Sequence, residues 1–475
     1  MQHKPLTSSV SRLSGLPAHQ LRKMIRDRDI SILELVEDSL AAIEETDPKL
    51  NAFVTVCPER AMGEAIRAQS RVHENDPSLS LLGLPLAVKD AEPVAGMPMG
   101  CGSLVHAGQI ARVDSIHVAR LRAAGAIVVG KTNTPEFTLL GETRNRLGPD
   151  TCNPWDRSRT PGGSSGGSAA ALAAGMVPLA TGSDTAGSIT VPSAFCGLVG
   201  LKPSHRRIPV WPNSDDWHPF ADVGPMARCI PDLILMLAAA SGPDARDPFA
   251  SQDLMPPYVP RCLRVAFGTT LAGKPVDPTC SAAGEALAML FAQAGHDVFS
   301  GIPDLVDPGP VLDLLGAEQE YRARGNLLAT NAGLLMPETR RILEQGRDSD
   351  PRGILAAREA QRAIVAAFDD FMVNVDLLVV PATACPAFPL RCPPSSINGR
   401  AVVPDWPSYA PFNMLANLTG CPVATLPMHL APGGLPVGAL VFAKFGCDAL
   451  LLSALAEAAI LRGEFPIAPD SNLLN

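Results

Sequence analysis

Hydrophobic and polar residues recur along the chain at spacings that predict helices. Ser31 is followed three residues later by Glu34, and apolar residues then repeat at helical spacing. This pattern predicts a capped amphipathic helix that ends at Asp47-Pro48. Further helices are predicted over residues 115–124, 168–175 and 448–462.

Short apolar runs between these helices predict buried strands. They cover residues 81–88, 126–130 and 376–381, and a proline stops the last of them. The first run ends abruptly at Lys89-Asp90. Because α/β sheets place their chemistry at the carboxyl ends of strands, Lys89 is a candidate functional residue. The alternation of helices and strands predicts a layered α/β fold.

The chain contains no internal repeat and no Pro/Gly/Ser linker that would divide it. Residues 204–220 and 390–411 lack periodicity and are predicted to be long surface loops of the kind that border sites. We therefore predict a single large domain over residues 1–475. It would comprise N-terminal helices to about 75, a catalytic core at 76–230, a more variable helical lobe at about 231–370, and a return to the core sheet at 371–475.

Composition and charge narrow the possible partners. The 475 residues are 46% hydrophobic and 18% charged, which is typical of a soluble protein with a large core. The net charge of −9 offers no positive field for phosphates and so argues against nucleic acid and anionic membranes. The N-terminus has no hydrophobic signal core, no apolar run is long enough to span a bilayer, and the eleven cysteines form no CxxC pair. We expect a cytoplasmic protein with reduced thiols and no metal site.

Two Gly/Ser loops flank one short Ala-rich helix. Residues 160–168 read TPGGSSGGS, and residues 181–192 read TGSDTAGSITVP. Such glycines let backbone N–H groups converge on a phosphate or an oxyanion, although flexible turns without chemistry are the simpler interpretation. Neither loop has the lysine of a Walker phosphate loop. Residues 162–166 match GxSxG, but the polar, proline-bounded approach at 153–161 disfavours the nucleophile elbow of α/β-hydrolases.

With their flanks, these loops resemble the amidase signature family. Its hallmarks are GGSSGGS, a second loop of the form DTxGSxxxP, and a tail AFCGxxGLKP, which correspond here to residues 162–168, 184–192 and 194–203. The segment LPLAVKD at 84–90 matches the family's lysine strand, and NLTGCPVA at 417–424 is also similar. The resemblance extends from about residue 30 to residue 460.

The resemblance implies an α/β/α domain with a central mixed β-sheet flanked by helices, and a Ser-Ser-Lys triad. Ser188 would be the nucleophile, and Ser164 would relay its proton to Lys89. A serine hydroxyl needs a base, and a lysine serves as one only when it is desolvated and neutral. The resemblance also implies a cis peptide bond between Gly163 and Ser164.

Further site residues follow from the same resemblance. It implies an oxyanion hole built from the backbone N–H groups of Thr185, Ala186, Gly187 and Ser188, and substrate contacts from Gly163, Ser165 and Thr190. No metal or organic cofactor is implied, because the triad needs none.

The implied reaction is hydrolysis of an amide C–N bond through an acyl-enzyme on Ser188. Thr190 stands where many members have arginine, which removes an anchor for a carboxylate. We therefore expect a stand-alone amidase for a neutral, apolar or aryl amide or carbamate (a urethanase), with esterase activity.

The alternative is the glutamine-hydrolysing A subunit of a tRNA-dependent amidotransferase, against which Thr190 and the Trp-rich segment 205–220 argue. An inactive binding scaffold is disfavoured because the triad is intact. The expected partner is the small-molecule amide, carbamate or ester, and formation of a homodimer is left open.

Overall fold

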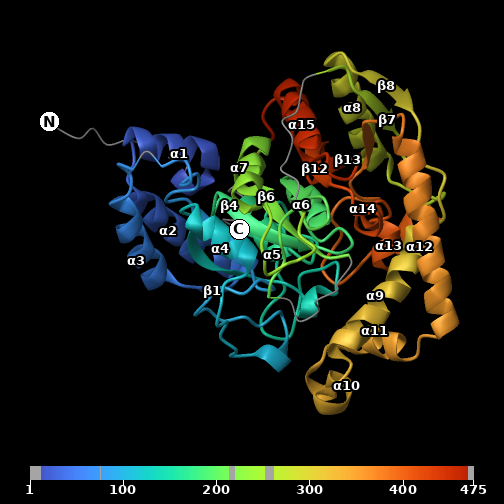
Figure 1. Ribbon diagram of the computed structural model, residues 1–475, viewed down its shortest axis with the longest axis horizontal. Helices are drawn as coiled ribbons and strands as arrows, with labels where there is room; N and C mark the ends of the chain where they lie inside the picture. The colour runs from blue at the N-terminus through green and yellow to red at the C-terminus, as the bar shows by residue number, and fades with distance from the viewer. Residues whose placement is uncertain (1–11, 75, 213–219, 252–260, 469–475) are drawn as a thin grey trace.

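A mixed eleven-stranded β-sheet organises the chain (Figure 1). The computed structural model describes residues 12–74, 76–212, 220–251 and 261–468. The strand order is β1-β3-β2-β4-β6-β5-β12-β13-β9-β7-β8. Strands β3, β2 and β4 run parallel to one another, as do β9, β7 and β8, and the strands between these groups pair antiparallel. The predicted α/β class with a central mixed sheet is confirmed.

The strands of the main sheet are short. They are β1 (Phe53–Val56), β2 (Pro85–Lys89), β3 (Ile127–Thr132), β4 (Leu179–Asp184), β5 (Val199–Lys202), β6 (Asp222–Ala227), β7 (Arg264–Phe267), β8 (Asp297–Ser300), β9 (Leu377–Pro381), β12 (Val423–Leu430) and β13 (Pro436–Ala443). A separate pair consists of β10 (Ser396–Ile397) and β11 (Arg400–Ala401).

Helices surround this sheet, with α1, α2 and α3 at one end and α9 to α12 at the other (Figure 1). They are α1 (Ala18–Asp27), α2 (Ile32–Leu50), α3 (Pro58–Gln69), α4 (Ile116–Ala123), α5 (Gly166–Ala173), α6 (Thr190–Cys196), α7 (Ile230–Ala240), α8 (Pro278–Gln293), α9 (Pro308–Arg324), α10 (Leu327–Thr330), α11 (Pro337–Arg347), α12 (Pro351–Met372), α13 (Trp406–Tyr409), α14 (Asn413–Thr419) and α15 (Asp448–Arg462). None of the described helices is both long and apolar enough to cross a membrane.

The central strands of the sheet are buried on both faces. Along β13, Ala439 and Val441 join one hydrophobic cluster, whereas Leu440 and Phe442 join another. Because successive side chains of a strand point to opposite faces, the two clusters lie on opposite sides of the sheet. Helices α7 and α15 contribute to the first cluster, and α6, α12 and α14 contribute to the second. Strands buried in this way are near-continuous apolar runs, which is how β2, β3 and β9 could be found in the sequence.

Several predicted elements are confirmed, and the predicted end of one helix is wrong. Ser31 and Glu34 form the predicted capping box of α2. That helix nevertheless continues through Pro48 to Leu50. Pro48 lies in the last turn, where it removes only one hydrogen bond, and the Asp47 carbonyl still accepts from Asn51 N. The helix ends where Asn51 takes a left-handed conformation, with φ of 55°.

Two segments contain strands or helices that the sequence did not indicate. The 390–411 segment, predicted to be a surface loop, holds the β10–β11 pair and helix α13. The stretch 231–370, predicted to be a helical lobe, also contributes β7 and β8 to the main sheet. These strands have only four residues each, which is too short for a reliable periodic signal. Part of the predicted loop 204–220 lies outside the described residues.

Candidate active site

Lys89 lies at the carboxyl end of β2 and is fully buried. All five residues of this strand are buried, and the strand runs between β3 and β4. The Lys89 ammonium nitrogen Nζ lies 2.6 Å from Ser164 Oγ, 2.9 Å from Ser165 Oγ and 2.9 Å from Ser183 Oγ. The apolar strand therefore delivers one amine into a cluster of three hydroxyl groups.

Burial lowers the pKa of Lys89 from its usual 10.5 to about 7, against the opposing negative charges of Asp184 and Glu92. Removal from water penalises the charged form of a lysine, and no carboxylate lies within hydrogen-bonding distance of Nζ to compensate for it. Near neutral pH, a substantial fraction of Lys89 is thus an uncharged amine that can accept a proton.

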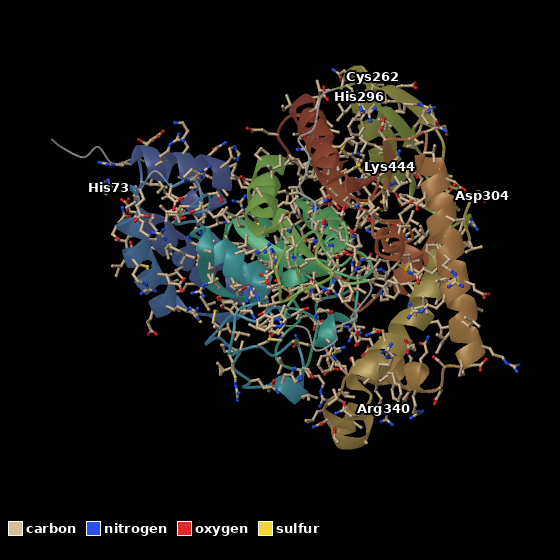
Figure 2. All side chains as sticks on the ribbon, viewed as in Figure 1. His73, Cys262, His296, Asp304, Arg340 and Lys444 are labelled. Carbon is tan, nitrogen blue, oxygen red and sulfur yellow. The ribbon has the colours of Figure 1, made fainter. Side chains whose placement is uncertain are left out.

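Two other lysines are equally buried but are paired. Lys131 Nζ donates to the Glu92 carbonyl at 2.6 Å and lies 3.4 Å from an Asp90 carboxylate oxygen. Lys202 Nζ donates to the Asp222 carboxylate at 2.9 Å. Most other charged groups lie on the outside of the molecule, as Arg340 and Asp304 do in Figure 2. Of the three lysines that are fully buried in the described part of the chain, only Lys89 is surrounded by hydroxyls in place of carboxylates.

The first Gly/Ser loop is anchored by threonines from neighbouring segments. Thr143 Oγ1 donates to the Gly162 carbonyl at 2.8 Å, and Thr134 Oγ1 donates to the Ser164 carbonyl at 3.0 Å. The peptide bond between Gly163 and Ser164 is cis, as the sequence resemblance implied. A Cβ on Gly163 would lie 2.8 Å from the Leu140 carbonyl oxygen, so the close approach of these segments requires glycine. The anchored loop holds the Ser164 hydroxyl against Lys89.

The second loop, residues 184–190, is folded around the carboxylate of Asp184. Its two oxygens accept hydrogen bonds from Gly187 N and Ile189 N, each at 2.7 Å. The Ser188 carbonyl accepts from Ser165 N at 3.2 Å, which joins the two loops directly. The Ser188 side chain is largely buried, and its hydroxyl makes no hydrogen bond within the described part of the chain. Lys89 and Ser164 are therefore in contact, while Ser188 is held beside them through its backbone.

The four predicted oxyanion donors are not equivalent. Gly187 N already donates to Asp184. The N–H groups of Thr185, Ala186 and Ser188 have no acceptor among the residues that the structure describes. These three groups are therefore the ones available to a developing negative charge.

A cavity of about 740 Å³ opens beside these loops. Ser183 and Thr185 form part of its wall. Its apolar lining includes Met99, Val113, Phe137, Leu139, Trp211 and Leu327, and its charged lining consists of Glu92, Arg112, Asp222, Glu320 and Arg324. The last two pair with each other, and Asp222 pairs with Lys202. The cavity is thus mainly apolar, and most of its charges are already partnered.

The residues predicted to contact substrate lie in the loops and not on this wall. Gly163, Ser165 and Thr190 are buried and are absent from the cavity lining. The Ser165 hydroxyl contacts Lys89, and Thr190 Oγ1 accepts from Asn413 Nδ2 at 2.9 Å. Two residues that contact the site were not predicted from the sequence. Ser183 contacts Lys89 and lies within the second motif. Trp406 donates a hydrogen bond to the Ala186 carbonyl, and its segment has no periodicity that could have indicated it.

One cluster among the described residues has ligand types suited to a metal, namely His19, Cys229 and Asp232. The Asp232 carboxylate caps the N-terminus of helix α1, where it accepts hydrogen bonds from Ala18 N at 2.7 Å and from His19 N at 2.9 Å. His19 Nδ1 contacts the same carboxylate at 2.8 Å. These contacts account for the cluster as a helix cap.

Comparisons with known proteins agree with this fold. The Amidase family model matches residues 34–452. The chain is 32% identical over 470 residues to an acylamidase of Rhodococcus erythropolis, which covers 94% of this chain and 95% of the relative. It is 33% identical over 505 residues to the A subunit of the glutamyl-tRNA(Gln) amidotransferase of Anaeromyxobacter dehalogenans. This match covers 98% of this chain and 100% of the relative. The crystal structure of a bacterial aryl acylamidase superposes with a TM-score of 0.86 at 25% identity, covering 94% of this chain and 96% of that one.

The fold and the loops define an α/β hydrolytic enzyme that acts on amide C–N bonds. The chain belongs to the amidase signature family.

Proposed function

We propose that the chain is a stand-alone amidase that cleaves neutral apolar or aryl amides, carbamates and related esters through an acyl-enzyme on Ser188. The observation that carries the proposal is the amine of Lys89, buried among hydroxyls, with a pKa lowered to about 7 and Ser164 Oγ at 2.6 Å. A general base whose pKa lies near the working pH is the most effective one.

In the proposed mechanism, neutral Lys89 accepts the proton of Ser164 as Ser164 accepts that of Ser188. Ser188 Oγ attacks the substrate carbonyl, and the N–H groups of Thr185, Ala186 and Ser188 stabilise the oxyanion of the tetrahedral intermediate. Protonated Lys89 then returns its proton through Ser164 to the leaving nitrogen. Water then attacks the acyl-enzyme ester on Ser188, with Lys89 and Ser164 transferring its proton to Ser188 Oγ as the acid is released. Ser164 suits the relay because a hydroxyl both donates and accepts a hydrogen bond.

The cavity supports the proposed substrate class. Its lining is mainly apolar, and two of its charged groups, Glu320 and Arg324, pair with each other. A neutral apolar or aryl substrate would bury its surface there without leaving a charge unpaired. The acylamidase of Rhodococcus erythropolis supports an amide substrate, and the similarity to a bacterial aryl acylamidase supports an aryl one. The glutamine-hydrolysing amidotransferase component remains the second candidate, because the A subunit of a glutamyl-tRNA(Gln) amidotransferase matches 98% of this chain at a similar identity.

A substrate panel separates the two candidates. We expect the purified chain alone to cleave neutral aryl amides, aryl carbamates and p-nitrophenyl esters, with kcat/KM at least about 100-fold higher than for L-glutamine, because glutamine must leave its charges unpaired in the cavity. Released amine, phenol or ammonia is the measurement. Activity on glutamine alone, or activity that requires added partner proteins, would contradict the proposal in favour of the amidotransferase.

Helix α9 contributes to the wall of the cavity and allows a test of substrate size. Ala323 of α9 lines the cavity. Ala323→Trp is expected to raise KM for aryl and long-chain amides by about tenfold and to leave KM for acetamide within about twofold of wild type. The reason is that the indole would occupy space that only the larger substrates use. Ala329→Trp, at an exposed position on α10 that does not line the cavity, is the matched control. An equal effect on large and small amides would argue against binding of the substrate along α9.

A further inference from the structure

Trp406 contacts the loop that carries Ser188 although it does not line the cavity. Its indole Nε1 donates to the Ala186 carbonyl at 2.7 Å, from a residue 220 positions away in the sequence. Trp406 is the first residue of α13, within the 390–411 segment that the sequence alone predicted to be a surface loop. The hydrogen bond thus links a segment without periodicity to the centre of the proposed chemistry.

This bond fixes one end of a peptide unit whose other end is also fixed. The carbonyl of that unit belongs to Ala186 and accepts from Trp406, and its N–H belongs to Gly187 and donates to Asp184 at 2.7 Å. A peptide unit is planar, so two bonds at opposite ends define its orientation.

The following peptide unit is fixed in the same manner. Its carbonyl, that of Gly187, accepts from Val191 N at 2.8 Å within the first turn of α6. The N–H of the same unit is that of Ser188, and in a trans peptide it points the opposite way from the carbonyl. The direction of the Ser188 N–H is therefore set by α6 on one side and by the Ala186–Gly187 unit on the other.

Trp406 is itself tightly constrained. Asp405 caps α13 by accepting from Ser408 N at 3.1 Å, and the Trp406 ring lies 5.5 Å from that of Tyr409. A Cβ on Gly141 would come within 2.0 Å of the indole, so glycine at this position leaves room for the ring. The donor is thus presented by a rigid support, which is what precise positioning of a catalytic loop requires.

We infer that Trp406 is a positioning residue of the catalytic loop. By holding the Ala186 carbonyl, its indole N–H keeps the Ser188 N–H directed at the carbonyl oxygen of the substrate as that oxygen becomes negatively charged. The inference rests on the proposed function, because it concerns the loop of the nucleophile. The hydrogen bond from Trp406 should matter more for the transition state than for the bound substrate, because the substrate carbonyl oxygen bears most of its negative charge in the transition state.

Trp406→Phe, which keeps an aromatic ring and removes only the donor, tests the inference. We expect kcat for an aryl amide to fall about tenfold to a hundredfold and KM to stay within about twofold of wild type. A small misplacement of an oxyanion donor has effects of this size on kcat. The affinity for an aryl boronic acid, which forms a tetrahedral adduct with a serine hydroxyl, should fall by the same factor as kcat.

Trp155→Phe is the matched control. Trp155 Nε1 donates to the Cys196 carbonyl at 2.9 Å, which is the same type of bond away from the 184–190 loop. We expect its kcat and boronate affinity to stay within about twofold of wild type even where its melting temperature falls. Because Trp406→Phe could fail to fold, Trp406→His and Trp406→Leu repeat the comparison, and the variant with a ring N–H should retain the higher kcat.

The outcomes separate this inference from the proposed function. Wild-type kcat and boronate affinity in Trp406→Phe, or equal kcat in the His and Leu variants, would show that Trp406 only packs against the loop. A parallel loss in Trp155→Phe would have the same meaning. Turnover that persists in Ser188→Ala would overturn the proposed function itself, whatever Trp406 does.

Discussion

Replacement of Ser188 by alanine is expected to lower kcat for amide hydrolysis by about 10⁴- to 10⁶-fold, with substrate affinity within about twofold of wild type. In serine hydrolases the nucleophile and its proton acceptor act as a unit, so removal of the hydroxyl leaves only binding and oxyanion stabilisation. The hydroxyls of Ser164 and Ser165 stay in contact with Lys89 in this variant, so the substitution removes the nucleophile and leaves the base in place.

The measurement combines steady-state rates with detection of the acyl-enzyme. A p-nitrophenyl ester should give a burst of p-nitrophenol in the wild type and none in Ser188→Ala, and mass spectrometry should find the acyl group on Ser188. Ser193→Ala serves as the control, because it removes a buried hydroxyl that donates only to the Ile189 carbonyl. Acylation of a peptide other than the one containing Ser188 would show that the nucleophile is misassigned.

The rate of hydrolysis is expected to depend on the protonation of Lys89. Burial lowers the pKa of Lys89 to about 7, and only the neutral amine can accept the proton of Ser164. With a substrate that does not itself titrate, kcat/KM should therefore be constant well above pH 7 and fall tenfold per pH unit well below it.

Two variants connect this pH profile to Lys89. Lys89→Met should lose about 10⁴-fold or more in kcat/KM, and its residual rate should show no inflection near pH 7. In Glu92→Gln, the inflection should move to lower pH, because the negative charge of Glu92 raises the pKa of Lys89. An unchanged inflection in Lys89→Met, or a shift to higher pH in Glu92→Gln, would assign the titration to another group.

The local pattern of the sequence determined much of the fold. The capping box of α2, the buried strand that ends at Lys89 and the last helix all follow from residues close in sequence, because side-chain periodicity and capping are local properties. The family resemblance of the 84–90 segment and of the first Gly/Ser loop likewise indicated Lys89 and Ser164, which the structure brings to 2.6 Å of each other. These are the features that a single sequence can carry.

Tertiary structure decided what depends on residues far apart in the sequence. The lowered pKa of Lys89 arises from burial between β3 and β4, and the engagement of Gly187 N by Asp184 depends on how the second loop folds. Trp406 reaches Ala186 only because α13 packs against the loop, and short strands such as β7 join the sheet by pairing with β9. Hydrogen bonds and burial between distant segments leave no periodic trace, so the sequence by itself determined the elements and the candidate chemical groups, and the packing of the whole chain determined their protonation and orientation.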